Sequence, residues 1–255
     1  MTEGNKLAKI INITFRKFKN INKKYAVEVL MAITLIISVY ICSSKAGIMV
    51  SGLDNEESFI VVIDAGHGGI DPGKVSTSGI KEKDVNLQIA LKLQEILEKK
   101  GIITIMTRSE DKGLYVDEDK KKKVADMKAR CEIINSSDAD ILVSIHQNSY
   151  QSENVKGAQV FYYKESAKGK KLAEYIQKNM IDMLDKSNGR KAKPNDSYYI
   201  LLNVKCPAVI CECGFLSNSA EAALLSDEAY QEKVAESIMN GITEYKKEIY
   251  GKSSQ

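Results

Sequence analysis

Tryptophan is absent from this 255-residue sequence, proline occurs only three times and histidine only twice. A share of 44% apolar and 28% charged residues fits an ordinary globular chain and argues against a disordered or fibrous one. No period of about 20 to 50 residues repeats, which argues against a solenoid or a propeller. With only two imidazoles in the chain, the positions of His67 and His146 carry particular weight.

Positive charge is concentrated at one end of the chain. Residues 1–50 hold eight lysines and arginines against two glutamates, a net of +6, so residues 51–255 carry 3 − 6 = −3 of the total of +3. A mildly acidic main region is a poor candidate for nucleic acid, whose phosphates need a basic face. The sequence also lacks GKS/T and GxGxxG, so its glycine-rich stretch after the first apolar run does not predict a nucleotide site. We expect no nucleic-acid partner.

The basic arm is followed by fourteen residues without a charge, from Val29 to Cys42. This order is typical of a signal peptide, and counted from Tyr25 the stretch reaches about 18 residues, close to a membrane-spanning helix. Ser44 and Ala46 suit cleavage, so a cleaved signal peptide and a retained signal-anchor both remain open. Positive charge before the apolar run predicts an exported domain, secreted or membrane-anchored. A buried core helix is the less favoured alternative, because the basic arm would then have no role.

Short apolar runs alternate with stretches of helical periodicity through the rest of the chain, which predicts βαβ units. We expect a single α/β domain at 59–250, after a linker at 51–58 and an N-terminal segment at 1–50 that holds the export or anchor helix. Its sheet should be twisted, mostly parallel and of about six strands, with helices on both faces. Strands are expected at 59–64, 102–106, 141–145, 157–163 and 208–212, with 198–202 a short strand or helical turn, and helices at 84–100, 124–136, 167–184, 219–225 and 227–249.

Sites in open α/β sheets lie beyond the carboxyl ends of the strands. His67 comes three residues after the first expected strand, His146 directly follows the strand at 141–145, and Glu212 ends the last strand. Glu82 lies in the loop before the helix at 84–100. Two imidazoles and a carboxylate are a familiar zinc set, with a fourth position left for water. The residues alone leave open both a metal site and two structural histidines.

Five sequence blocks favour a metal site over two structural histidines. In their order they resemble the Amidase_3 family of zinc-dependent N-acetylmuramoyl-L-alanine amidases. The resemblance covers about residues 58–246, and it is strongest to the germination-specific sporulation members. That preference rests on SIHQNS, on the YYILLN stretch, and on a short chain without appended wall-binding repeats. The five blocks are VVIDAGHGGIDPG (61–73), GIKEKDVNL (79–87), TR (107–108), ADILVSIHQNS (139–149) and PAVICECGFLSN (207–218).

The resemblance implies a role for each candidate residue. His67, Glu82 and His146 would bind Zn²⁺, and Glu212 would act in catalysis. The implied reaction is hydrolysis of the amide bond between N-acetylmuramic acid and L-alanine in peptidoglycan, in spore cortex maturation or germination, within the forespore or cell-wall compartment. Two alternatives stay open: another zinc peptidase that acts on cell-wall peptides, and a catalytically silent wall-binding module.

The resemblance also bears on regulation. Some relatives carry an inserted helix that blocks the site until an activator removes it. Here only residues 149–156 separate the SIH block from the next strand, which leaves little room for such a plug at that point. An external regulatory protein remains possible, and the oligomeric state is open.

Several charged residues near the blocks have two interpretations each. Asp64 could orient His67 or cap the turn after the first strand. Arg108 and Arg130 could bind a peptide carboxylate, but surface ion pairs are favoured. The lysine run at 120–123 is expected to be a solvated helix face, although it could also meet anionic wall polymers. Asp84 is expected to cap the helix that follows it.

Five cysteines raise the question of disulfides. Cys42 lies in the apolar N-terminal run, which leaves an even number in an exported domain, where disulfides can form. The alternation of Cys211 and Cys213 along an apparent strand favours free, buried thiols. Their spacing is not that of a zinc knuckle. The remaining two are Cys131 and Cys206.

Overall fold

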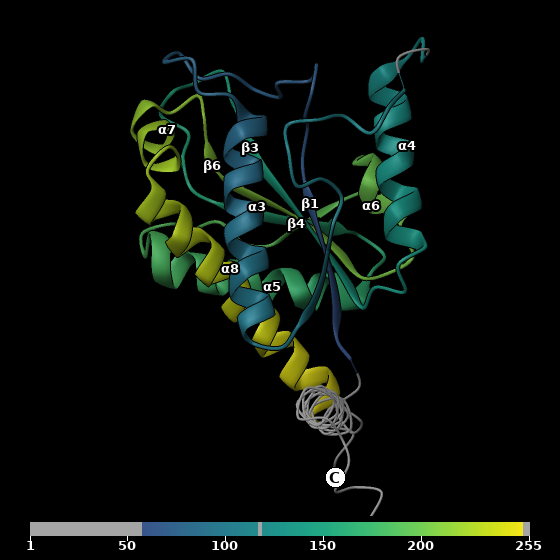
Figure 1. Ribbon diagram of the computed structural model, residues 1–255. Coiled ribbons are helices and arrows are strands. Elements are labelled where there is room, and N and C mark those ends of the chain that lie inside the picture. Colours follow the sequence, from purple (N-terminus) through teal and green to yellow (C-terminus); the bar gives the residue numbers. More distant parts are fainter. Residues whose placement is uncertain (1–57, 117–118, 252–255) are drawn as a thin grey trace, which may run out of the picture. The chain divides into compact units, whose positions relative to one another are not determined.

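A computed structural model describes residues 58–116 and 119–251. The expected export or anchor helix and nearly all of the expected linker lie outside these residues, so both stay predictions. Within the described part of the chain, no helix is both long enough and apolar enough to cross a membrane. This part forms one α/β unit, which Figure 1 shows as a sheet with helices on both sides.

Six strands form one sheet in the order β2-β1-β3-β6-β4-β5. The first four in this order run parallel to one another, β4 pairs antiparallel with β6, and β5 pairs parallel with β4. The expected mostly parallel sheet of about six strands is therefore confirmed. The strands are β1 (Ile60–Ala65), β2 (Ile103–Met106), β3 (Ile141–Asn148), β4 (Gln159–Tyr163), β5 (Lys193–Asn195) and β6 (Ala208–Phe215).

Helices cover both faces of the sheet, as expected, and in Figure 1 they separate into a group on the left and a group on the right. The left group holds α3, α7 and α8, the right group holds α4 and α6, and α5 crosses the lower part of the view. Buried residues of α5 share one core with those of α3 and α8. The bounds are α3 (Glu82–Lys99), α4 (Lys122–Asn135), α5 (Ala167–Leu184), α6 (Tyr199–Asn203), α7 (Ser219–Leu225) and α8 (Glu228–Tyr250).

Strand alternation divides the apolar side chains between two cores. Val61 and Ile63 of β1 pack with α3, α5 and α8 in the larger core, which has 32 buried residues. Val62, the residue between them, faces α4 and α6 in a second core of nine buried residues. Because successive side chains of a strand point to opposite faces, one short apolar run supplies both cores.

The structure corrects three details of the expected elements. Helix α3 begins at Glu82, so Asp84 lies within its first turn, and the N-cap residue Lys81 makes no side-chain capping bond. The segment 199–203 is the helical turn α6, one of its two expected forms. Strand β5 is not among the expected strands, and it contains Pro194, which is tolerated because β5 is an edge strand.

The four cysteines of the described residues are free, which confirms the expectation for Cys211 and Cys213 and settles the open question for Cys131 and Cys206. Cys211 and Cys213 lie in the larger core at 0% and 1% exposure. Burial raises the pKa of both thiols far above the usual range, so neither is a reactive thiolate. They act as small apolar side chains, while Cys42 lies outside the described residues.

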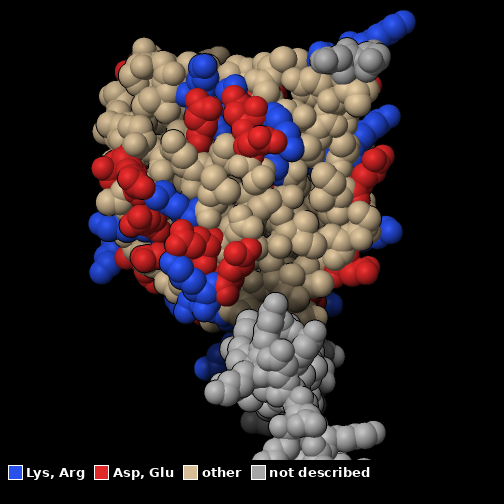
Figure 2. Space-filling model, viewed as in Figure 1, with Lys and Arg blue, Asp and Glu red and all other residues tan. Residues whose placement is uncertain are grey.

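Charged groups on the face viewed in Figure 2 are intermixed rather than separated by sign. Lys92 of α3, for example, forms ion pairs with Glu228 and Glu232 of α8. These pairs link two helices of the same layer across their exposed edges. Exposed pairs of this kind each contribute at most about 1 kcal/mol to stability.

Candidate metal centre and catalytic residues

The candidate residues gather at the carboxyl ends of β1, β3 and β6. His67 lies just after β1, His146 and Glu212 are register partners on β3 and β6, and Glu82 is the first residue of α3. A cavity of about 410 Å³ opens over this edge, between α4 and α6, and all four residues line it. The expectation that the strand ends would bring these residues together is therefore correct.

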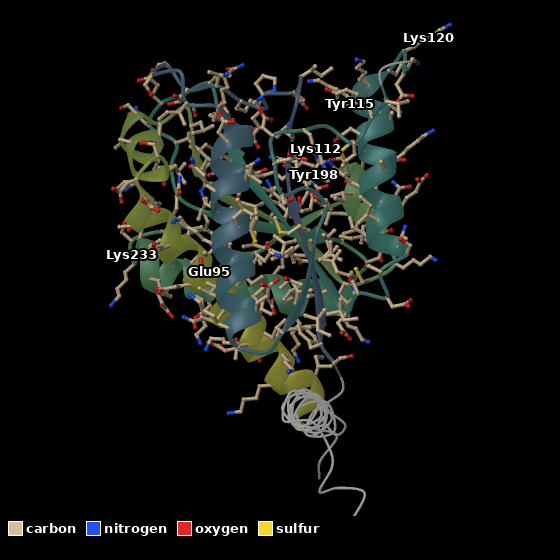
Figure 3. All side chains as sticks on the ribbon, viewed as in Figure 1. Glu95, Lys112, Tyr115, Lys120, Tyr198 and Lys233 are labelled. Atoms are coloured by element: carbon tan, nitrogen blue, oxygen red, sulfur yellow. The ribbon has the colours of Figure 1, made fainter. Side chains whose placement is uncertain are left out.

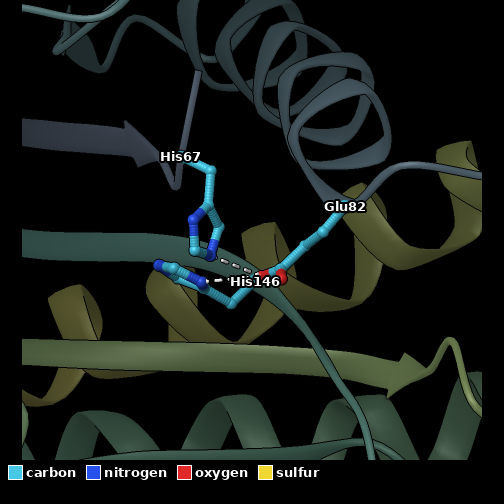
Figure 4. A group of neighbouring side chains, drawn as sticks. All are labelled: His67, Glu82 and His146. Atoms are coloured by element: carbon cyan, nitrogen blue, oxygen red, sulfur yellow. Dashed lines mark hydrogen bonds and ion pairs between the residues drawn. The ribbon is translucent and has the colours of Figure 1, made fainter. Parts of the chain in front are cut away.

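Three potential ligand atoms converge on one point from three different elements (Figure 4). Nε2 of His67 lies 3.2 Å from Oε1 of Glu82, and Nδ1 of His146 lies 2.9 Å from the same oxygen. The two imidazole rings stand edge to face, with 5.0 Å between their centroids. One atom from each of the three side chains thus lies within 4.8 Å of the others.

Glu82 is held as an ionised carboxylate although it is only 2% exposed. Burial alone would raise its pKa, but the hydrogen bonds and charges of His146 and His67 outweigh burial and hold that pKa well below the usual range. Oε2 accepts a hydrogen bond from the backbone N–H of Lys74, and Oε1 accepts one from the backbone N–H of Gln147. Its place at the start of α3 adds the favourable end of the helix dipole.

The chain takes a sharp turn to bring His67 to this point. His67 has a φ of 61°, in the left-handed region that non-glycine residues seldom adopt. Gly66, before it, packs against the ring of His146 so closely that a Cβ there would lie 2.3 Å from two ring atoms. A side chain at position 66 would therefore displace His146, which explains the glycine by close approach rather than by a phosphate site.

Two buried arginines donate hydrogen bonds to the backbone of this turn. The expectation that both would form surface ion pairs is therefore wrong. Arg108 and Arg130 are 2% and 1% exposed. Arg130 donates to the carbonyl oxygens of Ala65 and His67, and Arg108 donates to those of Ala65 and Gly66. The turn directs these carbonyls inward, and buried carbonyls need donors. Neither guanidinium is free to bind a substrate carboxylate.

Asp64 belongs to the same buried network and does not orient His67. Its carboxylate accepts hydrogen bonds from Thr107 at 2.7 Å, from Ser144 at 2.5 Å and from Arg130 at 2.6 Å. Burial would raise its pKa, but the charge of Arg130 and the two hydroxyls lower that pKa to about 2. Asp64 therefore neutralises a buried guanidinium instead of contacting an imidazole.

The second nitrogen of His67 is bonded to Asp71, a residue that the motif analysis did not single out. Nδ1 of His67 lies 2.9 Å from Oδ2 of Asp71, and Nζ of Lys123 on α4 lies 2.8 Å from Oδ1. A usable signal was present in the sequence, because Asp71 follows His67 by four residues inside a glycine-rich turn. In the lysine run at 120–123, Lys122 is half-buried and the other three are exposed, and Lys123 also borders the cavity. The expected solvated helix face is confirmed only in part, because the first two lysines precede α4.

Glu212 is buried beside the three convergent side chains and is 7% exposed. Burial and the charge of Glu82 raise its pKa to about 7, although His146, His67 and a hydrogen bond from Tyr198 oppose the shift. Oε2 of Glu212 has no hydrogen-bond partner among the described residues. This carboxyl can thus exchange a proton near neutral pH, which a general base or acid requires.

Tyr198 is a further residue of the cavity that the candidate set lacked. It lies just before α6, lines the cavity, and is labelled near the middle of Figure 3. Its ring meets Phe161 edge to face at 5.5 Å, and its backbone N–H donates to Asn195. Burial and the charge of Glu212 raise the pKa of Tyr198 to about 12, so its hydroxyl stays protonated as a neutral donor.

The donor set fits a zinc ion. Two imidazole nitrogens and one ionised carboxylate oxygen point at a common position, and these are the ligand types that zinc accepts in catalytic sites. Both imidazoles contact the same carboxylate oxygen, which places their nitrogens close enough to Oε1 of Glu82 to share one cation with it. Three protein ligands leave a further position open for water or substrate.

The segment between β3 and β4 contains no helix. Residues 149–158 form bends and turns only. The expectation that little room exists here for a helix that blocks the cavity is therefore confirmed for this part of the chain.

Comparisons with known proteins agree with this geometry. The family model for N-acetylmuramoyl-L-alanine amidases, Amidase_3, matches residues 61–244. A germination-specific N-acetylmuramoyl-L-alanine amidase of Bacillus subtilis is 41% identical over 189 residues, which are 73% of this chain and 79% of that protein.

Solved structures show the same relationship. The CwlD amidase of Clostridioides difficile, in complex with the GerS lipoprotein, is 44% identical with a TM-score of 0.72, over 74% of this chain and 98% of that one. An N-acetylmuramoyl-L-alanine amidase of Clostridium difficile 630 is 33% identical with a TM-score of 0.65, over 74% of this chain and 97% of that one. On these grounds, and as its motifs predicted, the chain belongs to the Amidase_3 family of N-acetylmuramoyl-L-alanine amidases.

Proposed function

We propose that this protein is a zinc-dependent amidase that hydrolyses the bond between N-acetylmuramic acid and L-alanine in peptidoglycan. The observation that carries the proposal is the convergence of His67, Glu82 and His146 beside the buried carboxyl of Glu212. The three convergent residues would hold the ion. When bound, zinc polarises the scissile carbonyl and lowers the pKa of a bound water.

Glu212 supplies the proton transfers of this reaction. Oε2, which has no partner among the described residues, accepts the proton of the attacking water. The hydroxyl oxygen of that water bonds to the carbonyl carbon, the C–N bond breaks, and Glu212 passes the proton to the departing amine of L-alanine. Burial favours this exchange, because it raises the pKa of Glu212 above that of an ordinary carboxyl and so makes the group a better proton acceptor.

The biological setting that we propose is the bacterial spore, in cortex maturation or germination. Support comes from the germination-specific amidase of B. subtilis, which is 41% identical to this chain. We also propose that residues 1–50 direct the domain across the cytoplasmic membrane, since a basic arm precedes an apolar run. The domain would then be secreted or anchored, in the compartment that holds the forespore cell wall.

An external protein partner is part of the proposal. The C. difficile CwlD structure contains such a partner, the GerS lipoprotein. In this chain, residues 149–158 hold no helix that could act as a plug. Control from outside the chain is consistent with both observations.

Mass spectrometry of peptidoglycan digested with the zinc-loaded protein tests the reaction. The expected products are muramic acid with a free lactyl carboxyl group and stem peptides that begin with L-alanine. Digests with the chelator-treated protein and with a Glu212→Gln variant serve as controls. Peptides cut within the stem would instead identify a different zinc peptidase.

A further inference from the structure

The two ring nitrogens of His67 face different partners. Nε2 points toward Oε1 of Glu82, at 3.2 Å, on the side where the three ligand atoms converge. Nδ1, on the other side of the ring, lies 2.9 Å from Oδ2 of Asp71. The ring therefore has one nitrogen for a metal ion and a second nitrogen that is already engaged by a carboxylate.

The backbone brings Asp71 back to His67 by a tight turn. Gly68 and Asp71 exchange two backbone hydrogen bonds, of 3.0 and 3.1 Å, which close the loop. His67, with its φ of 61°, starts this reversal. The closed loop thus brings the side chain of Asp71 within reach of the imidazole.

The carboxylate of Asp71 is itself held at both oxygens. Oδ2 contacts His67, while Oδ1 accepts from the backbone N–H of Gly73 at 3.3 Å and from Nζ of Lys123 at 2.8 Å. Lys123 belongs to α4, so this ion pair joins the start of that helix to the turn that carries His67.

We propose that Asp71 is a positioning residue for the metal ligand His67, and that Lys123 of α4 fixes the rotamer of Asp71. An ionised carboxylate at Nδ1 favours the tautomer that carries its hydrogen there, which leaves the Nε2 lone pair free for a cation. Carboxylate partners of this kind orient the ring and raise its basicity, and their loss typically weakens metal binding by about 10- to 100-fold. The inference rests on the proposed zinc site and assigns it one further carboxylate and one lysine.

Zinc affinity of the full chain tests the proposal without any assay of hydrolysis. Asp71→Ala should weaken zinc binding by about 10- to 100-fold in a chelator competition. Asp71→Asn keeps an acceptor but loses the charge, so its affinity should lie between those of Asp71→Ala and the wild type. Cobalt substitution gives a second measurement, because the visible absorption of Co²⁺ responds to ligand geometry and should change in Asp71→Ala.

Lys123 offers a matched comparison within its own lysine run. Lys123→Gln should weaken zinc binding by about two- to fivefold, since an exposed ion pair is worth at most about 1 kcal/mol, and it should add nothing in the Asp71→Ala background. Lys120, at the other end of the run, projects away from the body of the protein in Figure 3. Lys120→Gln removes the same charge and should leave zinc affinity unchanged.

The outcomes separate this inference from the proposed function. If His67→Ala abolishes tight zinc binding while Asp71→Ala and Asp71→Asn stay within twofold of the wild type, Asp71 does not position His67 and the inference is overturned. Equal effects of Lys120→Gln and Lys123→Gln would overturn the role of Lys123. If His67→Ala still binds one zinc tightly, the ligand set of the proposed function itself is wrong. Melting temperatures of the metal-free variants establish that each protein folds.

Discussion

Replacing Glu212 by glutamine separates chemistry from packing at a buried carboxyl of the cavity. Glutamine keeps the shape of the side chain but cannot accept a proton from water at neutral pH. Loss of a positioned acid–base group typically lowers kcat by about 10²- to 10⁴-fold, which corresponds to about 3 to 5 kcal/mol of transition-state stabilisation. Since that interaction exists mainly in the transition state, kcat should fall far more than KM rises.

The effect of the same change on stability follows from burial. A carboxyl whose pKa rises from 4.5 to about 7 on folding destabilises the metal-free folded protein, once ionised, by about 3 kcal/mol. Because folding raises the pKa of this acid, the penalty is absent below pH 4.5, grows as the pH rises toward 7, and stays constant above it. Glutamine removes this penalty but adds an amide at the position of Oε2, where a buried group without a partner costs about 1 to 3 kcal/mol.

These two opposing effects nearly cancel, so metal-free Glu212→Gln should be as stable as the wild type at pH 8, or more stable by up to about 2 kcal/mol. Thermal unfolding at pH 5 and pH 8 with a chelator present measures this difference. A purely structural role for Glu212 predicts the reverse, with stability and activity lost together. Zinc content should stay near the wild-type value.

Glu232→Gln on α8 is a matched control, because it removes a carboxylate that is exposed and pairs only weakly with Lys92. It should leave rate, zinc content and stability unchanged. The assignment of Glu212 fails if Glu212→Gln folds, holds zinc and hydrolyses peptidoglycan within tenfold of the wild type. It also fails if the variant is strongly destabilised at pH 8.

Four further predictions concern other parts of the chain. Chelation should lower the melting temperature, since zinc at about 1,000 times its Kd stabilises the native state by about 4 kcal/mol; an unchanged melting temperature would argue against a tight site. Arg130→Met should cost about 3 to 5 kcal/mol in urea unfolding at pH 7, because it leaves Asp64 buried without its counter-charge. The stabilisation due to the lowered pKa of Asp64 should be complete above pH 4 and be lost as the pH falls through about 2. A free energy of unfolding that stays constant between pH 4 and 2 would contradict this prediction. A fusion of residues 1–57 to a reporter that is active only outside the cytoplasm should be active, and an inactive but expressed fusion would defeat the export proposal.

Local sequence patterns were sufficient to predict most of the sheet and the convergence of the candidate residues. Alternation along β6 indicates that Ala208, Ile210 and Glu212 share a face, and the structure has the first two in the smaller core and the third in the cavity on the same side. The positions of His67 and His146 just after or at the ends of strands also predicted that they lie close together, because the carboxyl ends of parallel strands lie at one edge of the sheet.

Contacts made across the fold were not predictable in the same way. Burial of Arg130 depends on carbonyl groups more than 60 residues away that turn inward at one loop. A charged side chain is usually exposed, so the sequence alone favoured the wrong environment. The choice of Asp71 over Asp64 as partner of His67 likewise depends on the left-handed backbone at His67, which no side-chain pattern reports.

The unequal division of apolar packing across the sheet affects which parts of the protein tolerate substitutions. Thirty-two buried residues lie in the core that holds α3, α5 and α8, and only nine lie in the core beneath α4 and α6. The cavity opens on the sparsely packed side, so substitutions that reshape its walls disturb little of the packing that keeps the chain folded. Substitutions in this layer that leave Arg130 in place should therefore be better tolerated than substitutions in the opposite layer. Directed evolution of the amidase would best begin with libraries in α4 and α6 that keep Arg130.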